Sequence, residues 1–501
     1  MNKNVKNNRF LSTLLIVSTV LFTNVIFFTP KLFAQSAPDA KVSATLQARQ
    51  YMELINSVFN FVQNNYVDEV DPSVLYQGAL KGMMDSLKDP YTSYLDLSQM
   101  RNLTDTTVGN FGGVGLSITK PVESTPDKPA YVEVASPIED GPGYKAGIQA
   151  GDFLLEIDGT PTPDITMDEV LSMLRGTIGE TVTVLVKRGR NMQFSVVLTR
   201  ELIEVPTVKY SMIEKGNSKI GYLRIIEFTP QTAERVQAAL DSFKKNKYSG
   251  MIIDLRNNPG GLITSVADVA DKFIDEGVIV TTKSRLASEN VVFSASKSKT
   301  TVPQGTPIVV LINKGSASAS EILSGALKDD HLAYLVGERT YGKGSVQQVI
   351  PLYNDDGIKL TMARYYTPSD VNIDKIGIPP DLEILFPVLS DDEESAYVDL
   401  INSAAIENYV IDHPDMSEVH ISSYAKELQK TYNLTDTLLR RLIRVEVQRT
   451  KGASNYDLDY DVQLNAAIDL LQKGNFAQLL AGTKTLRELQ DEVILNEADT
   501  E

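Results

Sequence analysis

Three short segments rich in glycine and serine carry the residues most able to do chemistry. The first is Asn258–Gly261, whose two glycines leave backbone N–H groups uncovered. The second runs from Gly315 to Glu321 and contains three serines, and the third, Tyr341–Ser345, places one lysine between two glycines. A serine hydroxyl, an amine that takes its proton and N–H donors for an oxyanion are the parts of an acyl-transfer site. The three segments therefore suggest hydrolysis through a serine nucleophile.

The composition restricts the base that could activate such a serine. The chain of 501 residues has no cysteine and three histidines, which excludes disulfides, thiolate zinc sites and cysteine nucleophiles. His331 follows a predicted helix, at the sheet edge opposite the three segments, and His413 and His420 lie outside this region. Burial lowers the pKa of a lysine, and Ser–Lys pairs are an established variant of the catalytic triad. We therefore expect Lys343 to be the base for Ser318.

Backbone N–H groups near the serine would stabilise a tetrahedral intermediate. The amide of Ala319, at the start of a predicted helix, is one expected donor, and Gly260 or Gly261 supplies the other. A plainer alternative is that the serines only cap a helix and that the lysine is an exposed cation. For the serines alone or the lysine alone, a structural role is the better interpretation. The presence of both at one sheet edge favours a catalytic site.

The order of the predicted elements explains how these segments would meet. Residues 201–384 alternate strands with helices, including strands Met251–Leu255 and Ile308–Ile312 and a helix over Ala319–Lys328. This order predicts a mainly parallel sheet flanked by helices. In such a sheet the strand-to-helix junctions lie at one edge, where ligands bind. Ser318 and the lysine, 25 positions further on, would meet there.

Residues 108–200 have a different pattern, which is rich in strands and tight turns. Gly112 to Ile118 form a glycine-rich turn that runs into a strand, and a short helix, Met167–Leu174, comes before two closing strands. The whole order resembles a PDZ domain. Arg175, at the end of the helix, either contacts the region that carries the serine and lysine segments and couples peptide binding to activity, or is a plain surface arginine.

The resemblance to PDZ domains implies a peptide-binding groove. N–H groups of Gly113, Val114 and Gly115 would bind a free C-terminal carboxylate, and the peptide would add as a strand beside Leu116 to Ile118. The alternative is that these glycines only make a tight turn.

Longer motifs in residues 201–384 are similar to those of the carboxyl-terminal processing proteases, also called tail-specific proteases, of peptidase family S41. The matching stretches are Asp254 to Leu262, Gly315 to Ile322, Val336 to Glu338 and Gly342 to Gln347. The resemblance implies a crotonase/ClpP-like α/β core with Ser318 as the nucleophile and Lys343 as the general base. Gln347 would hydrogen-bond and orient the lysine. No metal or cofactor is implied. The segment Leu87–Leu95 matches the family's N-terminal signature only loosely.

The fold class expected is α/β multidomain, with the PDZ domain embedded before the protease core. The predicted parts are a signal peptide or N-terminal membrane anchor (1–34), a linker (35–45), an N-terminal helical cap or dimerisation module (46–107), the PDZ domain (108–200), the protease core (201–384) and a C-terminal helical extension (385–501). The helical modules favour a homodimer or higher homo-oligomer, and an adaptor or activating partner is a further candidate.

The N-terminus has the pattern of an export signal. Lys3, Lys6 and Arg9 come before an uncharged stretch from Phe10 to Phe28, and Ala34 ends a fair cleavage site. We expect a periplasmic or cell-envelope protein, which is either soluble after cleavage or tethered to the inner membrane. The net charge of −17 argues against nucleic acid as a partner.

The function expected from the sequence is an endopeptidase that recognises free C-terminal tails of proteins. Two other classes of function are alternatives to an endopeptidase. A non-catalytic scaffold that binds C-termini would have a broken Ser/Lys/Gln set, and here the set is intact. An acyl-CoA enzyme on a crotonase-like fold is disfavoured by the export signal and the PDZ domain.

Overall fold

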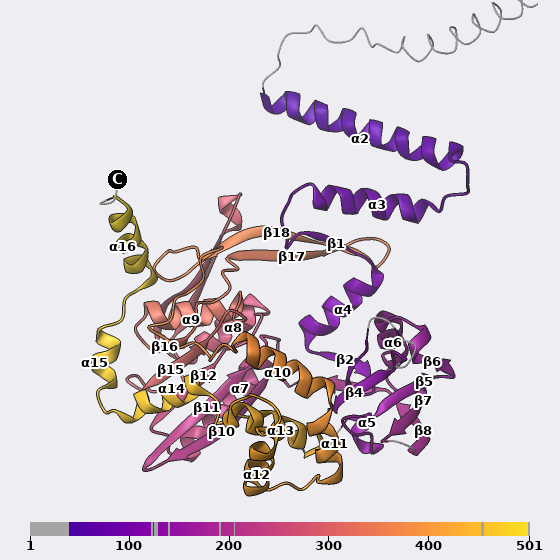
Figure 1. The fold of residues 1–501 in the computed structure, drawn as a ribbon. Helices are drawn as coiled ribbons and strands as arrows, with labels where there is room; N and C mark the ends of the chain where they lie inside the picture. Colours follow the sequence, from indigo (N-terminus) through magenta and orange to yellow (C-terminus); the bar gives the residue numbers. More distant parts are fainter. Residues whose placement is uncertain are drawn as a thin grey trace, which may run out of the picture. The chain divides into compact units, whose positions relative to one another are not determined.

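The computed structural model describes residues 40–498 except 122–123, 125–128, 139–140, 190–191, 205 and 452–454. The chain divides into two compact units, one up to Gly82 and one from Met83 (Figure 1). The predicted signal or anchor, residues 1–34, lies outside the described residues. Within the described part, no helix is both long and apolar enough to cross a membrane.

The first unit consists of helical chain with very little buried surface. Its helices are α2 (Ala40–Asn65) and the start of α3 (Pro72–Asp85), and none of the residues of α3 is buried. Proline is favoured in the first turn of a helix because its missing N–H is not needed there. The Asp71 carboxylate accepts the N–H of Ser73 at 2.8 Å, so Asp71 caps the start of α3. Leu54 and Phe61 of α2 are 60% and 67% exposed.

The PDZ region forms a small sheet with its own core. The sheet has the order β3-β4-β5-β7-β8, with β6 paired to β5, and a separate pair joins β2 to β9. The strands and helices of this region are β2 (Asn110–Gly113), β3 (Leu116–Thr119), β4 (Val132–Pro137), α5 (Pro142–Lys145), β5 (Phe153–Ile157), β6 (Thr160–Pro161), η1 (Thr162–Asp164), α6 (Met167–Leu174), β7 (Thr181–Arg188), β8 (Met192–Thr199) and β9 (Glu201–Glu204). The predicted helix over Met167–Leu174 is confirmed, and a capping box of Thr166 and Glu169 starts it.

The protease core is built on a six-stranded sheet of order β10-β11-β12-β15-β16-β19. Its strands are β10 (Val208–Lys215), β11 (Ser218–Ile225), β12 (Gly250–Asp254), β15 (Ile308–Ile312), β16 (Tyr334–Gly337) and β19 (Leu382–Glu383). All neighbours from β11 to β19 are parallel, and only β10 is antiparallel. The prediction of a mainly parallel sheet is therefore confirmed.

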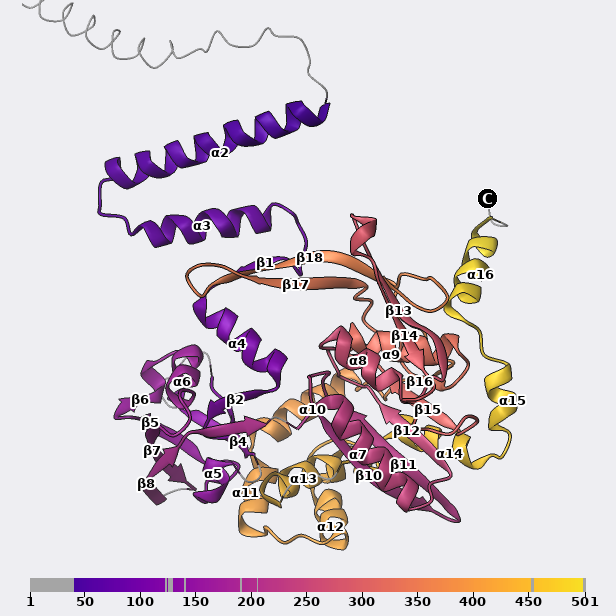
Figure 2. The ribbon, with the colours of Figure 1, turned by 180° about the vertical axis from the view of Figure 1, so that it is seen from behind.

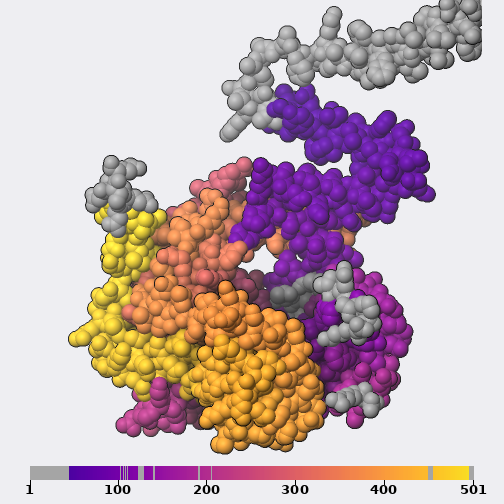
Figure 3. Space-filling model, viewed as in Figure 1, coloured from indigo at the N-terminus to yellow at the C-terminus, as the bar shows by residue number. Residues whose placement is uncertain are grey.

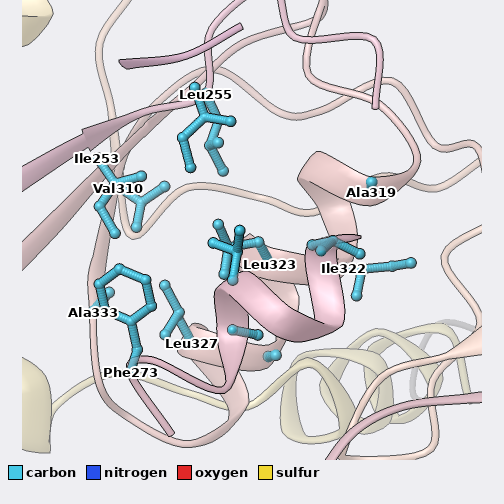
Figure 4. Packing of buried hydrophobic residues seen from close by; sticks show 14 of the residues in the cluster. Ile253, Leu255, Phe273, Val310, Ala319, Ile322, Leu323, Leu327 and Ala333 are labelled. Atoms are coloured by element: carbon cyan, nitrogen blue, oxygen red, sulfur yellow. The ribbon is translucent and has the colours of Figure 1, made fainter. Parts of the chain in front are cut away.

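The central strands are apolar on both faces because both faces are covered. One face packs against α7 (Thr232–Lys245), α8 (Ile263–Ala270) and α9 (Ala319–Asp329). Figure 4 shows Leu323 and Leu327 of α9 lying toward Ile253 and Val310 of the sheet. Such burial of continuous Val/Ile/Leu runs is typical of parallel sheets.

A second sheet, which the sequence pattern did not reveal, is antiparallel. It has the order β1-β18-β13-β14, and β17 pairs with β18. Its strands are β1 (Ser93–Leu95), β13 (Glu276–Ser284), β14 (Val291–Ser296), β17 (Ser345–Pro351) and β18 (Gly357–Tyr366); the helix α4 (Leu97–Val108) follows β1, and the turn η2 (Ala287–Glu289) joins β13 to β14. Strand β17 begins directly after the lysine segment, so the second sheet adjoins that segment (Figure 2).

The C-terminal extension has two parts. Helices α10 (Asp391–Asn402), α11 (Ala405–Asp412), α12 (Glu418–Leu428) and α13 (Asp436–Lys451) share a separate apolar core. Helix α14 (Val462–Gln472) instead covers the second face of the protease sheet, with Leu464 and Ile468 fully buried, and α15 (Phe476–Ala481) and α16 (Leu486–Ala498) follow. In Figure 3, the chain from α10 onward, coloured orange to yellow, forms a continuous surface on the face that is viewed.

One segment of the extension differs from its sequence pattern. The apolar spacing of Tyr460–Leu479 is typical of a single amphipathic helix, but α14 and α15 are separate helices. Gly474 lies between them with φ +70°. Glycine adopts this left-handed conformation without the steric cost that other residues pay, and it commonly ends helices.

Candidate active site

The Ser318 segment lies between β15 and α9, at the carboxyl edge of the parallel sheet. Ser318 is the residue before α9 and has φ +55°, a conformation that costs energy for any residue with a side chain. Its neighbours Ser316 and Ser320 are fully buried, and their hydroxyls donate to the carbonyls of Leu255 and Asn258. Those two serines therefore have structural partners. Ser318 is only half-buried, and among the described residues its hydroxyl has no hydrogen bond to another side chain.

The Glu321 carboxylate joins the serine segment to the lysine segment. Oε2 accepts the N–H of Ser318 at 2.8 Å and the N–H of Lys343 at 2.9 Å. Oε1 accepts the Thr340 hydroxyl at 2.6 Å and the N–H of Gly342 at 2.7 Å. One buried side chain in the first turn of α9 thus fixes the backbone on both sides of the site.

Burial raises the pKa of the Glu321 carboxyl, and its four hydrogen bonds oppose that rise. All four partners are donors, so only the ionised carboxylate, which accepts and does not donate, satisfies them. Its place near the start of α9 also favours negative charge, because the helix dipole is positive there.

The Lys343 segment is held by close packing of its two glycines. A Cβ on Gly342 would lie 3.0 Å from the nitrogens of Ile376 and Gly377, and one on Gly344 would lie 2.6 Å from the nitrogen of Asp374. Gly342 also has φ +88°. The glycines on either side of the lysine are therefore required by the backbone that passes beside them.

The lysine amine lies in a half-buried setting without a counter-ion. In the described part of the chain it has no hydrogen bond or ion pair, and Nζ lies over the Tyr91 ring, 4.9 Å from the centroid. Burial lowers the pKa of Lys343, and the nearby charge of Lys359 lowers it further, whereas Glu321 and Asp89 act in the opposite direction. The net effect favours the neutral amine, which is the form that a base needs.

The glycine segment lies directly against Ser318. A Cβ on Gly260 would be 2.8 Å from the Ser318 Cβ and 3.0 Å from the Ala319 nitrogen. The N–H of Gly260 already donates to the Asn258 side chain at 2.9 Å. Among the described hydrogen bonds, the N–H groups of Gly261 and Ala319 have no acceptor. Of the two glycines proposed as oxyanion donors, Gly261 is the one whose N–H is available.

Gln347 lies on β17, directly after the lysine segment. Its amide nitrogen donates its hydrogen bonds to groups other than Lys343. Nε2 donates to the Ser345 hydroxyl at 2.9 Å and to the Thr361 hydroxyl at 3.2 Å. Within the described residues, no hydrogen bond joins Gln347 to Lys343, so the orienting contact expected from the family resemblance is not formed here.

Sequence reasoning missed the residues that surround the lysine from the second sheet. Asp89 accepts the Thr361 hydroxyl, and Tyr91 presents its ring to Lys343. The segment Leu87–Leu95 was noted only as a loose motif match. Its contact with the site depends on the pairing of β1 with β18, which joins positions more than 250 residues apart.

The residues proposed for peptide binding lie where a groove can form. In the described sheet, β3 pairs only with β4, so the strand that carries Leu116 and Ile118 has a free edge. The turn between β2 and β3 contains Val114 and Gly115, whose N–H groups donate no described hydrogen bond outside the strands, and Gly115 has φ +67°. Gly113 ends β2, opposite Glu201.

Arg175 lies at the end of α6 and turns toward α4 and β2. Its guanidinium is 4.5 Å from the centroid of the Phe111 ring. It also lines a cavity of about 130 Å³ together with residues of α4, among them Leu97 and Arg101. These contacts are with the segment that leads into the PDZ region.

The histidines lie in other surroundings. His331 is exposed beyond the end of α9, and its Nδ1 lies 2.8 Å from the Thr483 hydroxyl. In the C-terminal helices, His413 stacks on the Tyr409 ring and His420 meets that ring edge-on. No described contact places any of the three histidines beside the serine segment.

Comparison with known proteins assigns three parts of the chain. Residues 219–384 match the peptidase family S41, residues 133–188 match a PDZ domain, and residues 15–98 match the N-terminal domain of the activating protease CtpB. Among solved structures, the photosystem II D1 C-terminal processing protease is 31% identical with a TM-score of 0.40, over 66% of this chain and 92% of that one.

Two curated relatives extend the match over most of the chain. The carboxy-terminal processing protease CtpA of Bacillus subtilis is 29% identical over 456 residues, which are 89% of this chain and 88% of that protein. The carboxy-terminal-processing protease of Bartonella bacilliformis is 37% identical over 378 residues, which are 74% of this chain and 84% of that protein. This chain therefore belongs to the carboxy-terminal processing proteases of peptidase family S41, serine-type endopeptidases, and carries a PDZ domain.

Proposed function

We propose that the protein is an exported endopeptidase that binds the free C-terminal tail of a substrate protein in its PDZ groove and cleaves the chain with Ser318 and Lys343. The observation that carries the chemistry is the Glu321 carboxylate, whose Oε2 accepts the N–H of both residues. It holds the two segments together at the sheet edge where ligands bind in parallel folds.

The chemistry follows from the groups present. The neutral Lys343 amine takes the proton of the Ser318 hydroxyl as the oxygen attacks the peptide carbonyl. The N–H groups of Ala319 and Gly261 donate to the oxyanion. The intermediate then collapses, the amine of the leaving peptide takes the proton from the lysine, and an ester to Ser318 remains. Water, deprotonated by the same lysine, hydrolyses the ester and frees the serine.

Two substitutions test the catalytic part. Ser318→Ala and Lys343→Ala should each abolish cleavage of an internally quenched peptide with an apolar free C-terminus, while thermal unfolding remains cooperative. His331→Ala, a histidine beyond the end of α9, is the matched control and should cleave at the normal rate. Retained cleavage in either of the first two variants would rule out the proposed pair.

The tail-binding part is tested by amidating the peptide. Supporting it, among the described residues, are the free edge of β3 and the N–H groups of Val114 and Gly115, which donate no described hydrogen bond. A C-terminal amide removes the negative charge that such N–H groups favour, so KM should rise with little change in kcat. Equal KM values for acid and amide would contradict recognition of the carboxylate.

Export and assembly complete the proposal. Export is supported by the basic residues Lys3, Lys6 and Arg9 before an uncharged stretch, and fractionation of cells that express the full chain tests it. The exposed apolar side chains of α2, such as Leu54 and Phe61, support a homo-oligomer or an activating partner. Light scattering of the purified protein distinguishes these two.

A further inference from the structure

Strand β1 and the residues just before it bring the Asp89 carboxylate to the part of the second sheet that adjoins the lysine segment. Asp89 Oδ2 accepts the Thr361 hydroxyl at 2.5 Å and the Thr92 hydroxyl at 2.6 Å, and Oδ1 accepts the Tyr91 N–H at 3.1 Å. Pairing of Ser93 with Lys359 between β1 and β18 fixes this placement. Figure 2 shows β1, β17 and β18 side by side.

The Asp89 carboxyl is held in its ionised form. Burial acts to raise the pKa of Asp89, but the hydrogen bonds from Thr361, Thr92 and Tyr91, together with the charge of Lys343, lower it below its ordinary value. An ionised carboxylate accepts and never donates. The single proton of the Thr361 hydroxyl must therefore point to Asp89.

The hydrogen bond to Asp89 determines which hydrogen-bonding role the Thr361 hydroxyl can take toward Gln347. Its oxygen keeps lone pairs but has no second proton, so toward the glutamine it acts only as an acceptor. Gln347 Nε2 donates to it at 3.2 Å and to the Ser345 hydroxyl at 2.9 Å. A register shift in β17 between Val346 and Gln347 places the glutamine opposite Thr361. If the Gln347 amide were rotated by half a turn, its carbonyl oxygen would face a lone pair of the Thr361 hydroxyl oxygen, which is unfavourable.

Both N–H groups of Gln347 are thus used, and within the described residues its carbonyl oxygen Oε1 has no partner. We propose that Asp89 and Thr361 form a relay that orients the Gln347 amide, leaving the carbonyl oxygen as the atom that receives an N–H of the Lys343 amine. The proposal rests on the proposed function, because it assigns positioning residues to the Ser–Lys site. Asp89 and Thr361 act through the glutamine and touch no reacting atom.

The charged and titratable groups facing Lys343 come from several elements. They are Glu321 from α9, Lys359 from β18, and Asp89 and Tyr91 from the segment before β1. Asp89 therefore has two separable effects, a hydrogen-bonded relay through Thr361 and a negative charge that raises the pKa of Lys343. Thr361→Val removes the first effect alone, and Asp89→Asn removes both.

The test measures kcat, KM and the pH dependence of kcat/KM for an internally quenched peptide with an apolar free C-terminus. Thr361→Val should lower kcat by about 10- to 100-fold with little change in KM, since a misoriented group costs rate and not binding. Thr361→Ser, which keeps the hydroxyl, should recover most of kcat. Asp89→Asn should lower the plateau and also move the acid limb to lower pH, because it removes a charge that favours the protonated amine.

Tyr94→Phe is the matched control. The Tyr94 hydroxyl donates to Asp356 at 2.6 Å across the same β1–β18 contact but lies outside the relay. Its loss should leave kcat near the normal value. Normal kcat in Thr361→Val, failure of Thr361→Ser to recover it, or an equal loss in Tyr94→Phe would each overturn the relay. Ser318→Ala is run in parallel: if it still cleaves, the proposed function fails, whereas a silent Thr361→Val with inactive Ser318→Ala overturns the relay alone.

Discussion

Two buried charges on helix α9, Lys328 and Glu321, are held in opposite ways. At the C-terminal end, Lys328 is 1% exposed and forms an ion pair with Asp381. At the N-terminal end, Glu321 is fully buried but is satisfied by backbone N–H groups and a threonine hydroxyl, and the Lys343 amine has no ion pair among the described residues. The Lys328–Asp381 pair neutralises two buried charges and stabilises the fold. The Glu321 carboxylate is satisfied by backbone N–H groups, so it does not need the Lys343 amine as a counter-ion, and that amine can change its protonation state.

The largest effect expected from this comparison is on catalysis. Lys343→Met should reduce cleavage by roughly 10³-fold or more, because the serine loses its base. Stability should change by less than about 1 kcal/mol, since no ion pair is broken. Peptide cleavage and urea unfolding measured on the same protein check both. A large loss of stability would mean that the lysine at this end is structural too.

Lys328→Met should give the reverse result. Removing it leaves Asp381 buried without its partner, which costs about 3–5 kcal/mol of unfolding free energy. Cleavage per folded molecule should remain near normal. The double variant Lys328→Met/Asp381→Leu replaces both charges by apolar groups and should recover most of the stability. If the double variant is no more stable than the single one, the pair is not the cause.

The pH dependence of cleavage sharpens the comparison further. The amine is active when neutral, so kcat/KM should rise as pH increases through the lowered pKa of Lys343. The positive charge of Lys359 helps to lower that pKa. Lys359→Gln should therefore raise it and move the acid limb to higher pH, by less than about one unit. Lys245→Gln, the same charge change in α7, should leave the limb in place, and equal shifts would indicate a general charge effect.

The smallest effect is expected at His331, beyond the C-terminal end of α9. His331→Ala removes an exposed contact to Thr483. Stability should change by no more than about 0.5 kcal/mol, with cleavage and its pH profile unaltered. A lost acid limb would show that a histidine, and not the lysine, supplies the titrating group.

Much of the protease fold could be predicted from the sequence because its signals are local. Apolar runs separated by helical periods predicted strands Ile308–Ile312 and Met251–Leu255 to within a residue or so at each end. The family and the PDZ domain were also predicted correctly from motifs. In these regions neighbouring residues specify the structure.

The parts that sequence reasoning missed depend on distant contacts. The antiparallel sheet joins β1 to β18 across more than 250 residues, and the local sequence pattern does not indicate which distant strand β1 pairs with. From the sequence, Glu321 can be either an acid that tunes the site or a structural acid at a helix start. Its hydrogen bonds become apparent only when the Thr340–Lys343 backbone folds onto it. Gly474 was missed as a helix break because the apolar period continues on both sides of it.

The position of α14 has a consequence for the order in which the protease sheet is covered. The strands β11, β12 and β15 present Tyr222, Ile252 and Leu311 to this helix, which is made some 150 residues after β15. During synthesis the sheet that carries the serine and lysine segments therefore has one uncovered apolar face until α14 has been made. Both faces of this sheet are covered only after that helix has packed.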